Sequence, residues 1–287
     1  MTLIAVVLNW NGGDDTPAAL ASLEGIDTIC VDNGSTDGSD AVVEERFPHV
    51  ELIRTGANLG FAGGNNAGIR RALERGAGWV LLMNNDATAE QGLADALSRA
   101  TDARPDAGLL ACTVLNEDGS VQYAGARFNA RLGYSGRLET SVPAGPRDVA
   151  RADGAAMAVS RAAAEQAGLL DEQLFAYVED VEWSLRIRRA GFAVVLVPEA
   201  RVRHKGSTAT GGKRSTTNLY YATRNTIVVS ERHARLPRGA RGLRRGVVVG
   251  AHLAQSFSHP SRVAAMRAVL AGWRDARAGR LGQRSSV

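Results

Sequence analysis

The 287-residue chain is predicted to fold as an α/β protein, with a mostly parallel central sheet flanked by helices. Two observations predict this class. Short aliphatic and β-branched runs recur along the first 115 positions, and segments with helical spacing separate them. Polar clusters follow several of these runs directly, as expected where the carboxyl ends of parallel strands form a binding site.

The expected elements follow one another along the chain. Strands are predicted at 3–8, 28–31, 50–53, 79–83 and 108–115, with helices at 63–76 and 89–100. Glycine-rich, polar sequence then predicts a hairpin and loops up to Asp153. A strand at 155–160, a helix at 160–169, a helix at 178–191 ending at Gly191 and a pair of strands at 192–204 complete the pattern. We expect one domain over 1–230 and a basic helical C-terminal extension over 231–287.

The charge is unevenly distributed. Residues 232–287 contain twelve Arg and one Asp, so this segment carries +11 and the rest of the chain carries −7 of the net +4. Stacking aromatics are not interleaved with the basic residues, so no nucleic-acid partner is expected. Two interpretations of the tail stay open: an amphipathic helix in peripheral contact with an anionic membrane, or a helix that packs on the core or on a second copy in a homodimer.

The cysteines and the N-terminus bear on localisation. Cys30 and Cys112 stand alone in apolar stretches without metal-ligand spacing, so we expect buried thiols in a reducing compartment. The first residues have no basic leader, and no transmembrane helix is expected. The sequence therefore predicts a cytoplasmic protein, with any membrane contact peripheral and on the inner face.

Generic motifs are absent or incomplete. No G-x-G-x-x-G follows the first strand, which disfavours a dinucleotide fold. The stretch DNGSTDGSD places Gly34 where a calcium loop needs a ligand, which argues against a calcium site.

Five ordered motifs together resemble a known family. LNWNG, VDNGSTDGS, NLGFAGGNNAG, LLMNNDA and FAYVEDVEWSLRIRRAG, in this order and spacing, are similar to family 2 glycosyltransferases, especially the rhamnosyltransferase-like branch. The resemblance covers roughly residues 1 to 230. It implies the GT-A fold (nucleotide-diphospho-sugar transferase), a pyrimidine nucleotide-sugar donor and inverting transfer to an acceptor hydroxyl.

The resemblance also implies donor contacts. Asp32 is expected to accept a hydrogen bond from the pyrimidine base, although it could instead cap a turn. A glycine-rich loop entering a helix suits a diphosphate, because glycine permits close approach and helix-start N–H groups attract anions. The remaining residues expected at the nucleotide sugar are Asn9, Trp10, Asn58, Gly60, Phe61, Gly63, Asn66, Asn84, Asn85 and Asp153.

A metal site is implied by Asn84-Asn85-Asp86, which occupies the position of the family's D-x-D triplet with a single carboxylate. Asp86 is expected to coordinate Mg²⁺ or Mn²⁺ at the donor phosphates, with His204 as the second protein ligand. One carboxylate suggests that the ion arrives with the donor.

The acidic cluster in FAYVEDVEW contains the expected catalytic base. An inverting transfer needs a carboxylate that takes the proton of the acceptor hydroxyl, and Asp180 stands where the family keeps it. We expect the helix start to keep Asp180 ionised, Glu179 to contact the acceptor or tune its neighbour, and Glu182 to orient the loop or face solvent. Further along, Arg224 could reach a phosphate or belong to a structural helix.

The predicted function is therefore an inverting, metal-dependent glycosyltransferase. Its expected donor is dTDP-L-rhamnose, with a UDP-hexose next, and its acceptor is a glycan, a lipid-linked sugar or a small molecule. The alternative is a catalytically silent nucleotide-sugar-binding protein, which would lack the base or the metal carboxylate. A nucleotidyltransferase is disfavoured because NWNGGDDT contains no Lys or Arg.

Overall fold

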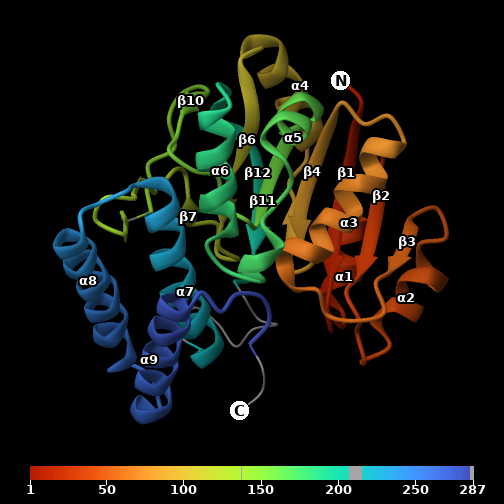
Figure 1. Ribbon diagram of the computed structural model, residues 1–287. Coiled ribbons are helices and arrows are strands. Elements are labelled where there is room, and N and C mark those ends of the chain that lie inside the picture. Colours follow the sequence, from red (N-terminus) through yellow and green to blue (C-terminus); the bar gives the residue numbers. More distant parts are fainter. Residues whose placement is uncertain (137, 207–214, 285–287) are drawn as a thin grey trace.

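A computed structural model describes residues 1–136, 138–206 and 215–284. A central sheet runs through the molecule in the order β10-β12-β6-β11-β4-β1-β2-β3, with β5 added to β12 and β7 to β6 (Figure 1). Strands β8 and β9 form a separate antiparallel pair. Neighbours β1, β2, β3 and β4 pair in parallel, as do β6 and β12, whereas β11 runs antiparallel between β4 and β6. The expected α/β class with a mostly parallel sheet is confirmed.

The first half of the chain alternates strands and helices as expected. Its elements are β1 (Leu3–Asn9), α1 (Asp15–Ala21), β2 (Asp27–Asp32), α2 (Ser39–Arg46), β3 (Glu51–Arg54), α3 (Gly60–Glu74), β4 (Trp79–Asn84), β5 (Ala87–Ala89), α4 (Leu93–Ala103) and β6 (Ala107–Leu115). All nine residues of β6 are buried, because helices or loops cover both faces of the central strands.

The second half contains the loop-rich region and the return to the sheet. Short strands β7 (Val121–Tyr123), β8 (Phe128–Asn129), β9 (Tyr134–Ser135) and β10 (Arg147–Asp148) precede β11 (Ala156–Ser160), α5 (Arg161–Ala167), the 3₁₀ helix η1 (Glu172–Leu174) and α6 (Glu179–Arg189). The expected final strand pair is instead one long strand, β12 (Ala193–His204). Its register on β6 shifts between Val197 and Arg201, a segment that contains Pro198, and the strand continues on both sides of this irregularity.

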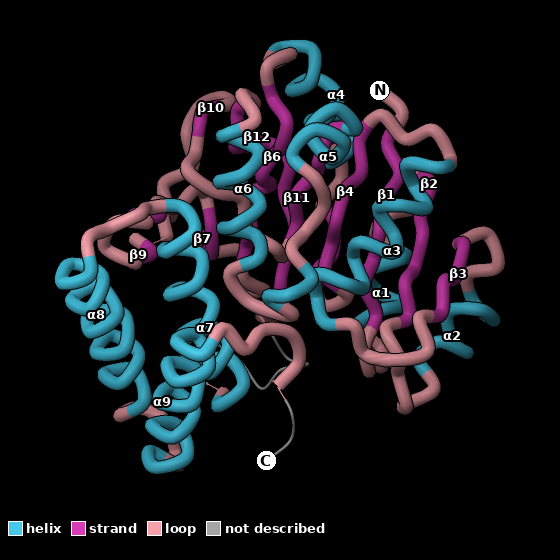
Figure 2. The backbone as a smooth tube through the Cα atoms, in the orientation of Figure 1, coloured by secondary structure: helices cyan, strands magenta, loops and turns pink. Residues whose placement is uncertain are grey.

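Three helices form the C-terminal part: α7 (Thr216–His233), α8 (Arg238–Ser256) and α9 (Arg262–Ala278). They gather at the side of the molecule away from β2 and β3, as the tube in Figure 2 shows. The expected boundary at 230/231 falls inside α7, and residues 285–287 of the expected extension lie outside the described residues.

Helices α7 and α9 share a small hydrophobic core of their own, built from Leu219, Tyr220, Tyr221, Ala265, Ala268 and Val269. Gly272 allows close packing here, because a Cβ at this position would lie 2.4 Å from the carbonyl oxygen of Tyr220. Among the described residues, no helix combines the length and hydrophobicity needed to span a bilayer. Cys30 and Cys112 are free and buried as expected, and burial raises the pKa of each thiol to about 12.

Candidate active site

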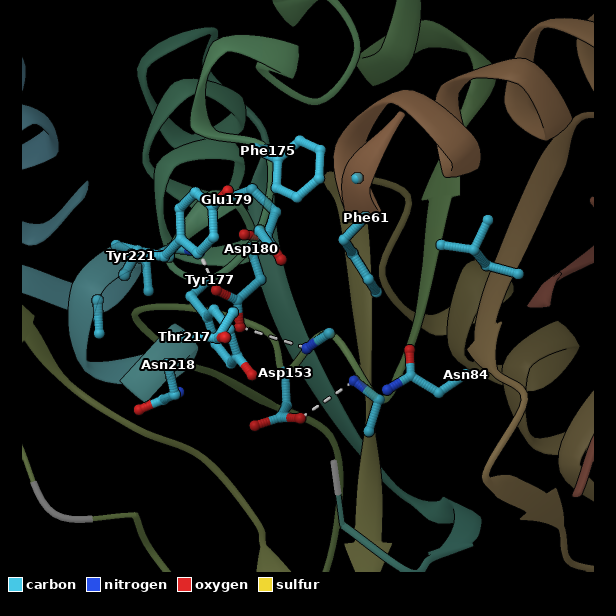
Figure 3. A pocket seen from close by; sticks show the side chains of 18 of the residues that line it. Phe61, Asn84, Asp153, Phe175, Tyr177, Glu179, Asp180, Thr217, Asn218 and Tyr221 are labelled. Carbon is cyan, nitrogen blue, oxygen red and sulfur yellow. Dashed lines mark hydrogen bonds between the residues drawn. The ribbon is translucent and has the colours of Figure 1, made fainter. Parts of the chain in front are cut away.

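A cavity of about 540 Å³ opens at the carboxyl ends of β1 and β4. Trp10 and Asn84 come from these strand ends, and the start of α3 adds Phe61. The facing wall consists of the segment before β11, the start of α6 and the first turns of α7 (Figure 3). Figure 3 shows Asp153, Glu179 and Asp180 on this wall beside Phe175, Tyr177 and Tyr221.

Most of the residues expected from the sequence line this one cavity. They are Trp10, Asn58, Gly60, Phe61, Asn84, Asn85, Asp86, Asp153, Glu179, Asp180 and His204. The fold thus brings the expected base, the expected metal ligands and part of the expected donor site together, from segments up to 194 positions apart in the sequence.

Asn9 and Asp32 are not among the lining residues, because their side chains bond to each other behind the wall. Asn9 is fully buried, and its Nδ2 donates to Asp32 Oδ1 at 3.0 Å and to Ser39 Oγ at 2.9 Å. Asp32 Oδ2 accepts from the amide of Ser35 at 3.2 Å. The pair therefore fixes the ends of β1 and β2, and Asp32 has the turn-capping contact that its sequence context allowed.

Gly63 and Asn66 also lie away from the cavity. A Cβ on Gly63 would sit 2.7 Å from the Cβ of Leu59, so this glycine serves packing at the start of α3. Asn66 donates to Leu170 O and Glu172 Oε1, both at 2.9 Å, and accepts from the amide of Leu170 at 3.0 Å. Its amide therefore anchors the segment before η1 to α3.

Gly60 lines the cavity, and the structure gives it a second role. It adopts φ +76°, and a Cβ there would lie 2.4 Å from the carbonyl oxygen of Phe175. Glycine is therefore needed for the approach of another backbone segment, because an L side chain would meet both strain and collision.

Asp86 and His204 face each other across a short strand pair. Ala87 of β5 lies opposite His204 of β12, and His204 Nε2 lies 3.1 Å from Asp86 Oδ1. Both side chains are less than a tenth exposed. His204 Nδ1 lies 2.9 Å from Gln122 Oε1, which can only accept a hydrogen bond, so Nδ1 carries the proton and Nε2 faces the carboxylate.

This pair fits a divalent cation. His204 Nε2 is buried, has no hydrogen-bond partner among the described residues and lies beside the Asp86 carboxylate. An imidazole nitrogen and a carboxylate oxygen are both ligands of divalent cations. Within the described residues, no group of three or more His, Cys, Asp or Glu side chains is arranged to hold a metal. The described residues therefore offer two candidate ligands at this position.

Asp180 sits at the start of α6 with its carboxylate held in place. Its Oδ2 accepts from the amide of Gly154 and from Nη1 of Arg151, each at 3.3 Å. Burial raises the pKa of Asp180, against the lowering effect of Arg151, so the helix start does not by itself keep this group ionised as expected.

Glu179 is more deeply buried than its neighbour, at 5% exposure, and its Oε2 has no hydrogen-bond partner among the described residues. Burial and then the charge of Asp180 raise its pKa to about 8. Two adjacent carboxyl groups with raised pKa values disfavour double ionisation, so the pair retains one proton to higher pH than either carboxyl group would alone.

The structure decides between alternatives that the sequence left open for Glu182 and Arg224, and it adds Arg151 to the site. Glu182 does not face solvent: it is 3% exposed and pairs with Arg186 at 2.7 Å. Arg224 cannot reach a phosphate in the cavity, because it is 1% exposed and its guanidinium donates to backbone carbonyls. Arg151 is not among the residues expected from the sequence, although it stands two positions before Asp153 in RADG.

The comparisons with known proteins agree with this geometry. The model of the family described as glycosyl transferase family 2 matches residues 6–166. A relative named N-acetylglucosaminyl-diphospho-decaprenol L-rhamnosyltransferase, from Mycobacterium tuberculosis, is 32% identical over 88% of this chain and 95% of its own length. A dTDP-rhamnosyl transferase named RfbF, from Shigella flexneri, is 26% identical over 63% of this chain, which spans 62% of that relative.

A solved structure supports the fold assignment. GalNAc-T7, crystallised with UDP, GalNAc and Mn²⁺, superposes with a TM-score of 0.61 at 15% identity, over 86% of this chain and 54% of that one. At this identity the likeness concerns the fold alone. Together with the family match over the segment that contains Asn84-Asn85-Asp86, it establishes that the chain is a glycosyltransferase of family 2 with the GT-A fold.

Proposed function

We propose that the protein is an inverting, metal-dependent transferase that moves a sugar from a pyrimidine nucleotide sugar, preferentially dTDP-L-rhamnose, to a hydroxyl of a glycan on a lipid diphosphate. The observation that carries this proposal is one cavity with a buried, oriented carboxylate, Asp180, on one wall and the Asp86–His204 pair on another. The names of the relatives from M. tuberculosis and S. flexneri support rhamnose and a lipid-linked acceptor. A UDP-hexose is the next donor to consider.

The residues have separate tasks in the proposed reaction. Trp10, Asn58 and Asn84 contact the donor from the strand ends and the start of α3. Asp180 takes the proton of the acceptor hydroxyl as that oxygen attacks the anomeric carbon from the side opposite the diphosphate. Glu179 lines the cavity with an unpartnered Oε2, so in its protonated form it would donate a hydrogen bond to a sugar or acceptor oxygen.

Asp86 and His204 would hold Mg²⁺ or Mn²⁺, which when bound offsets the negative charge of the departing diphosphate. Because the part of the chain that the structure describes offers two ligands at that position, we expect the ion to bind together with the donor. Metal affinity measured without nucleotide should then be weak.

Peripheral membrane contact is part of the proposal. Helices α8 and α9 expose Leu243, Val247, Val263 and Leu270 on the sides turned away from their packing partners. The surrounding segment carries +11, which favours an anionic lipid surface and disfavours pairing with a second copy of equal charge.

Release of nucleotide diphosphate by the purified protein tests the proposal, with dTDP-L-rhamnose, UDP-hexoses and GDP-sugars each offered with Mg²⁺, Mn²⁺ or EDTA. We expect metal-dependent release from dTDP-L-rhamnose and a product whose anomeric configuration is opposite to that of the donor. Asp180→Asn should reduce transfer about 10²- to 10⁴-fold. Asp95→Asn, an exposed carboxylate in α4, is the matched control. Nucleotide binding without turnover of any donor would support the silent binding protein instead.

A further inference from the structure

The segment that leads into α6 has an unusual backbone. Phe175, Tyr177 and Val178 have φ values of +65°, +66° and +74°, in the left-handed region. L side chains rarely adopt this region, and a β-branched residue such as Val178 is least suited to it. Residues 173–178, which we call the α6 entry loop, therefore need contacts from outside to keep this conformation, and Asp180 follows directly.

Two adjacent residues of α7 make those contacts. The side-chain amide of Asn225 donates to the carbonyls of Leu174 and Ala176 at 2.9 Å and of Tyr177 at 2.7 Å. Arg224 Nη2 donates to Leu174 O at 2.8 Å. Both side chains are at most 1% exposed. We call Arg224 and Asn225 the α7 clamp.

The C-terminal segment beyond α9 also contacts Arg224 and the α6 entry loop. Arg224 Nη1 donates to the carbonyl of Gly282, and the amide of Gly282 donates to Gln173 O, both at 2.6 Å. Arg224 therefore binds the α6 entry loop with one nitrogen and the end of the described chain with the other.

The same helix reaches the cavity itself. The ring of Tyr221 stacks on Phe175 with a centroid separation of 5.3 Å, and the Arg224 guanidinium lies 4.8 Å from the Tyr221 centroid. Thr217, Asn218 and Tyr221 line the cavity in Figure 3, on the side of Asp180. One face of α7 thus borders the substrate space, while the clamp holds the loop that positions the proposed base.

We propose that Arg224 and Asn225 are positioning residues for sugar transfer, and that α7, although it lies outside the segment matched by the family model, is an integral part of the active site. The inference rests on the proposed role of Asp180. Without the clamp, the left-handed residues relax, the start of α6 shifts and the Asp180 carboxylate leaves its position in the cavity. Among the described residues, the clamp has no hydrogen bond to Trp10 or Asn84, so nucleotide binding at the ends of β1 and β4 should persist. The start of α3 approaches Phe175 of the α6 entry loop and can shift with it.

Asn225→Ala in the full-length protein provides the test. Because displacement of a reacting group by about 1 Å can cost on the order of 10²-fold in rate, we expect kcat for transfer to fall about 10- to 100-fold, with the Kd for nucleotide diphosphate changed by less than about 2-fold. Hydrogen exchange at the amides of residues 174–178 should accelerate. Val229→Ala, fully buried in the same helix but without a polar side chain, is the matched control for lost stability.

A second substitution separates positioning from general stability. Glycine tolerates φ +74° without strain, so Val178→Gly should reduce the cost of losing the clamp. We expect Asn225→Ala to lower kcat less in the Val178→Gly background than in the wild type, whereas a role in global stability alone predicts additive effects. If Asn225→Ala does not fold, Arg224→Lys, which keeps the charge but loses the forked geometry, gives the same measurement.

The outcomes are distinct. A drop in kcat with unchanged nucleotide affinity, faster exchange in the loop and partial rescue by Val178→Gly supports the clamp. An Asn225→Ala enzyme with the kcat of Val229→Ala, in a preparation where Asp180→Asn is inactive, overturns the clamp and leaves the proposed function intact. A wild type that transfers no sugar, or an Asp180→Asn enzyme with full activity, overturns the proposed function itself.

Discussion

Replacing Arg151 by methionine should move the acid limb of the pH profile of kcat/KM to higher pH. Arg151 Nη1 lies 3.3 Å from Asp180 Oδ2 and 3.9 Å from Asp153 Oδ2, and its side chain is only 10% exposed. Its positive charge opposes the effect of burial, which raises the pKa of Asp180. Methionine has a similar length and no charge, so this opposition is lost and the base becomes harder to ionise.

The magnitude follows from the separation of the charges. Two unit charges 3.3 Å apart interact by about 5 kcal/mol at an effective dielectric constant of about 20. Arg151 interacts with the carboxylates of both Asp153 and Asp180. The pKa of a carboxylate beside an arginine is commonly lowered by about 1–3 units. A shift of about two units lowers kcat/KM about 100-fold at pH values below both pKa values and leaves it unchanged at pH values above both.

The assay is kcat/KM for transfer between pH 5 and 9, with equilibrium unfolding measured in parallel, because loss of one partner from a buried ion pair costs about 3–5 kcal/mol. Arg151→Lys keeps the charge and should shift the limb by less than about one unit. Arg147→Met removes another partly buried arginine, paired with Glu139 and outside the cavity lining, and should not shift it. An Arg151→Met profile with a lower plateau and an unmoved acid limb would refute the reasoning.

Three further changes have defined outcomes. Asp86→Asn should abolish the difference between assays with Mn²⁺ and with EDTA, because it removes the carboxylate of the proposed metal pair; turnover that still depends on metal would contradict the assignment. Glu179→Gln should change the pH dependence of the free energy of unfolding, measured by urea denaturation. Because the pKa of Glu179 is raised from 4.5 to about 8 in the folded state, the folded protein keeps a proton that the unfolded chain loses, and wild-type stability falls as the pH rises from 4.5 to 8. The variant should lack the part of this fall that comes from Glu179. Gly60→Ala should lower both kcat and the free energy of unfolding, by about 1–3 kcal/mol, because its Cβ would lie 2.4 Å from Phe175 O; a wild-type denaturation midpoint would argue against this contact.

The strand-end motifs could be predicted because parallel strands must deliver their carboxyl ends to one edge of the sheet. The approximate position of Trp10, Asn84 and Asp86 follows from that rule. The direction in which each side chain points does not follow from that rule, because a short polar group at a strand end can form hydrogen bonds inside the protein or point into the cavity. Asn9 and Asp32 bond to each other behind the cavity wall, and this choice depends on Ser35 and Ser39, which approach only in the folded chain.

The contacts of Arg151 and of the α7 clamp could not be predicted for a different reason. Arg151 meets Asp180 across 29 positions, and Asn225 meets Tyr177 across 48. Nothing in YVED indicates that Tyr177 and Val178 take positive φ values, because neither residue favours that conformation. Packing imposes this conformation, so it is visible only in three dimensions.

The pairing of β5 with β12 fixes the position of Asp86 relative to His204. Asp86 and His204 are joined through a backbone ladder, in which Ala87 lies opposite His204 and the amide of Lys205 donates to Asp86 O. A one-residue insertion in either strand would turn one of these side chains to the opposite face of the sheet. The loop-rich region between Asn116 and Asp153 is tied to the same site, because Gln122 of β7 lies 2.9 Å from His204 Nδ1 and Arg151 donates to Asp180. Changes of length in this region would therefore preserve the geometry of the cavity only where they leave these two contacts in place.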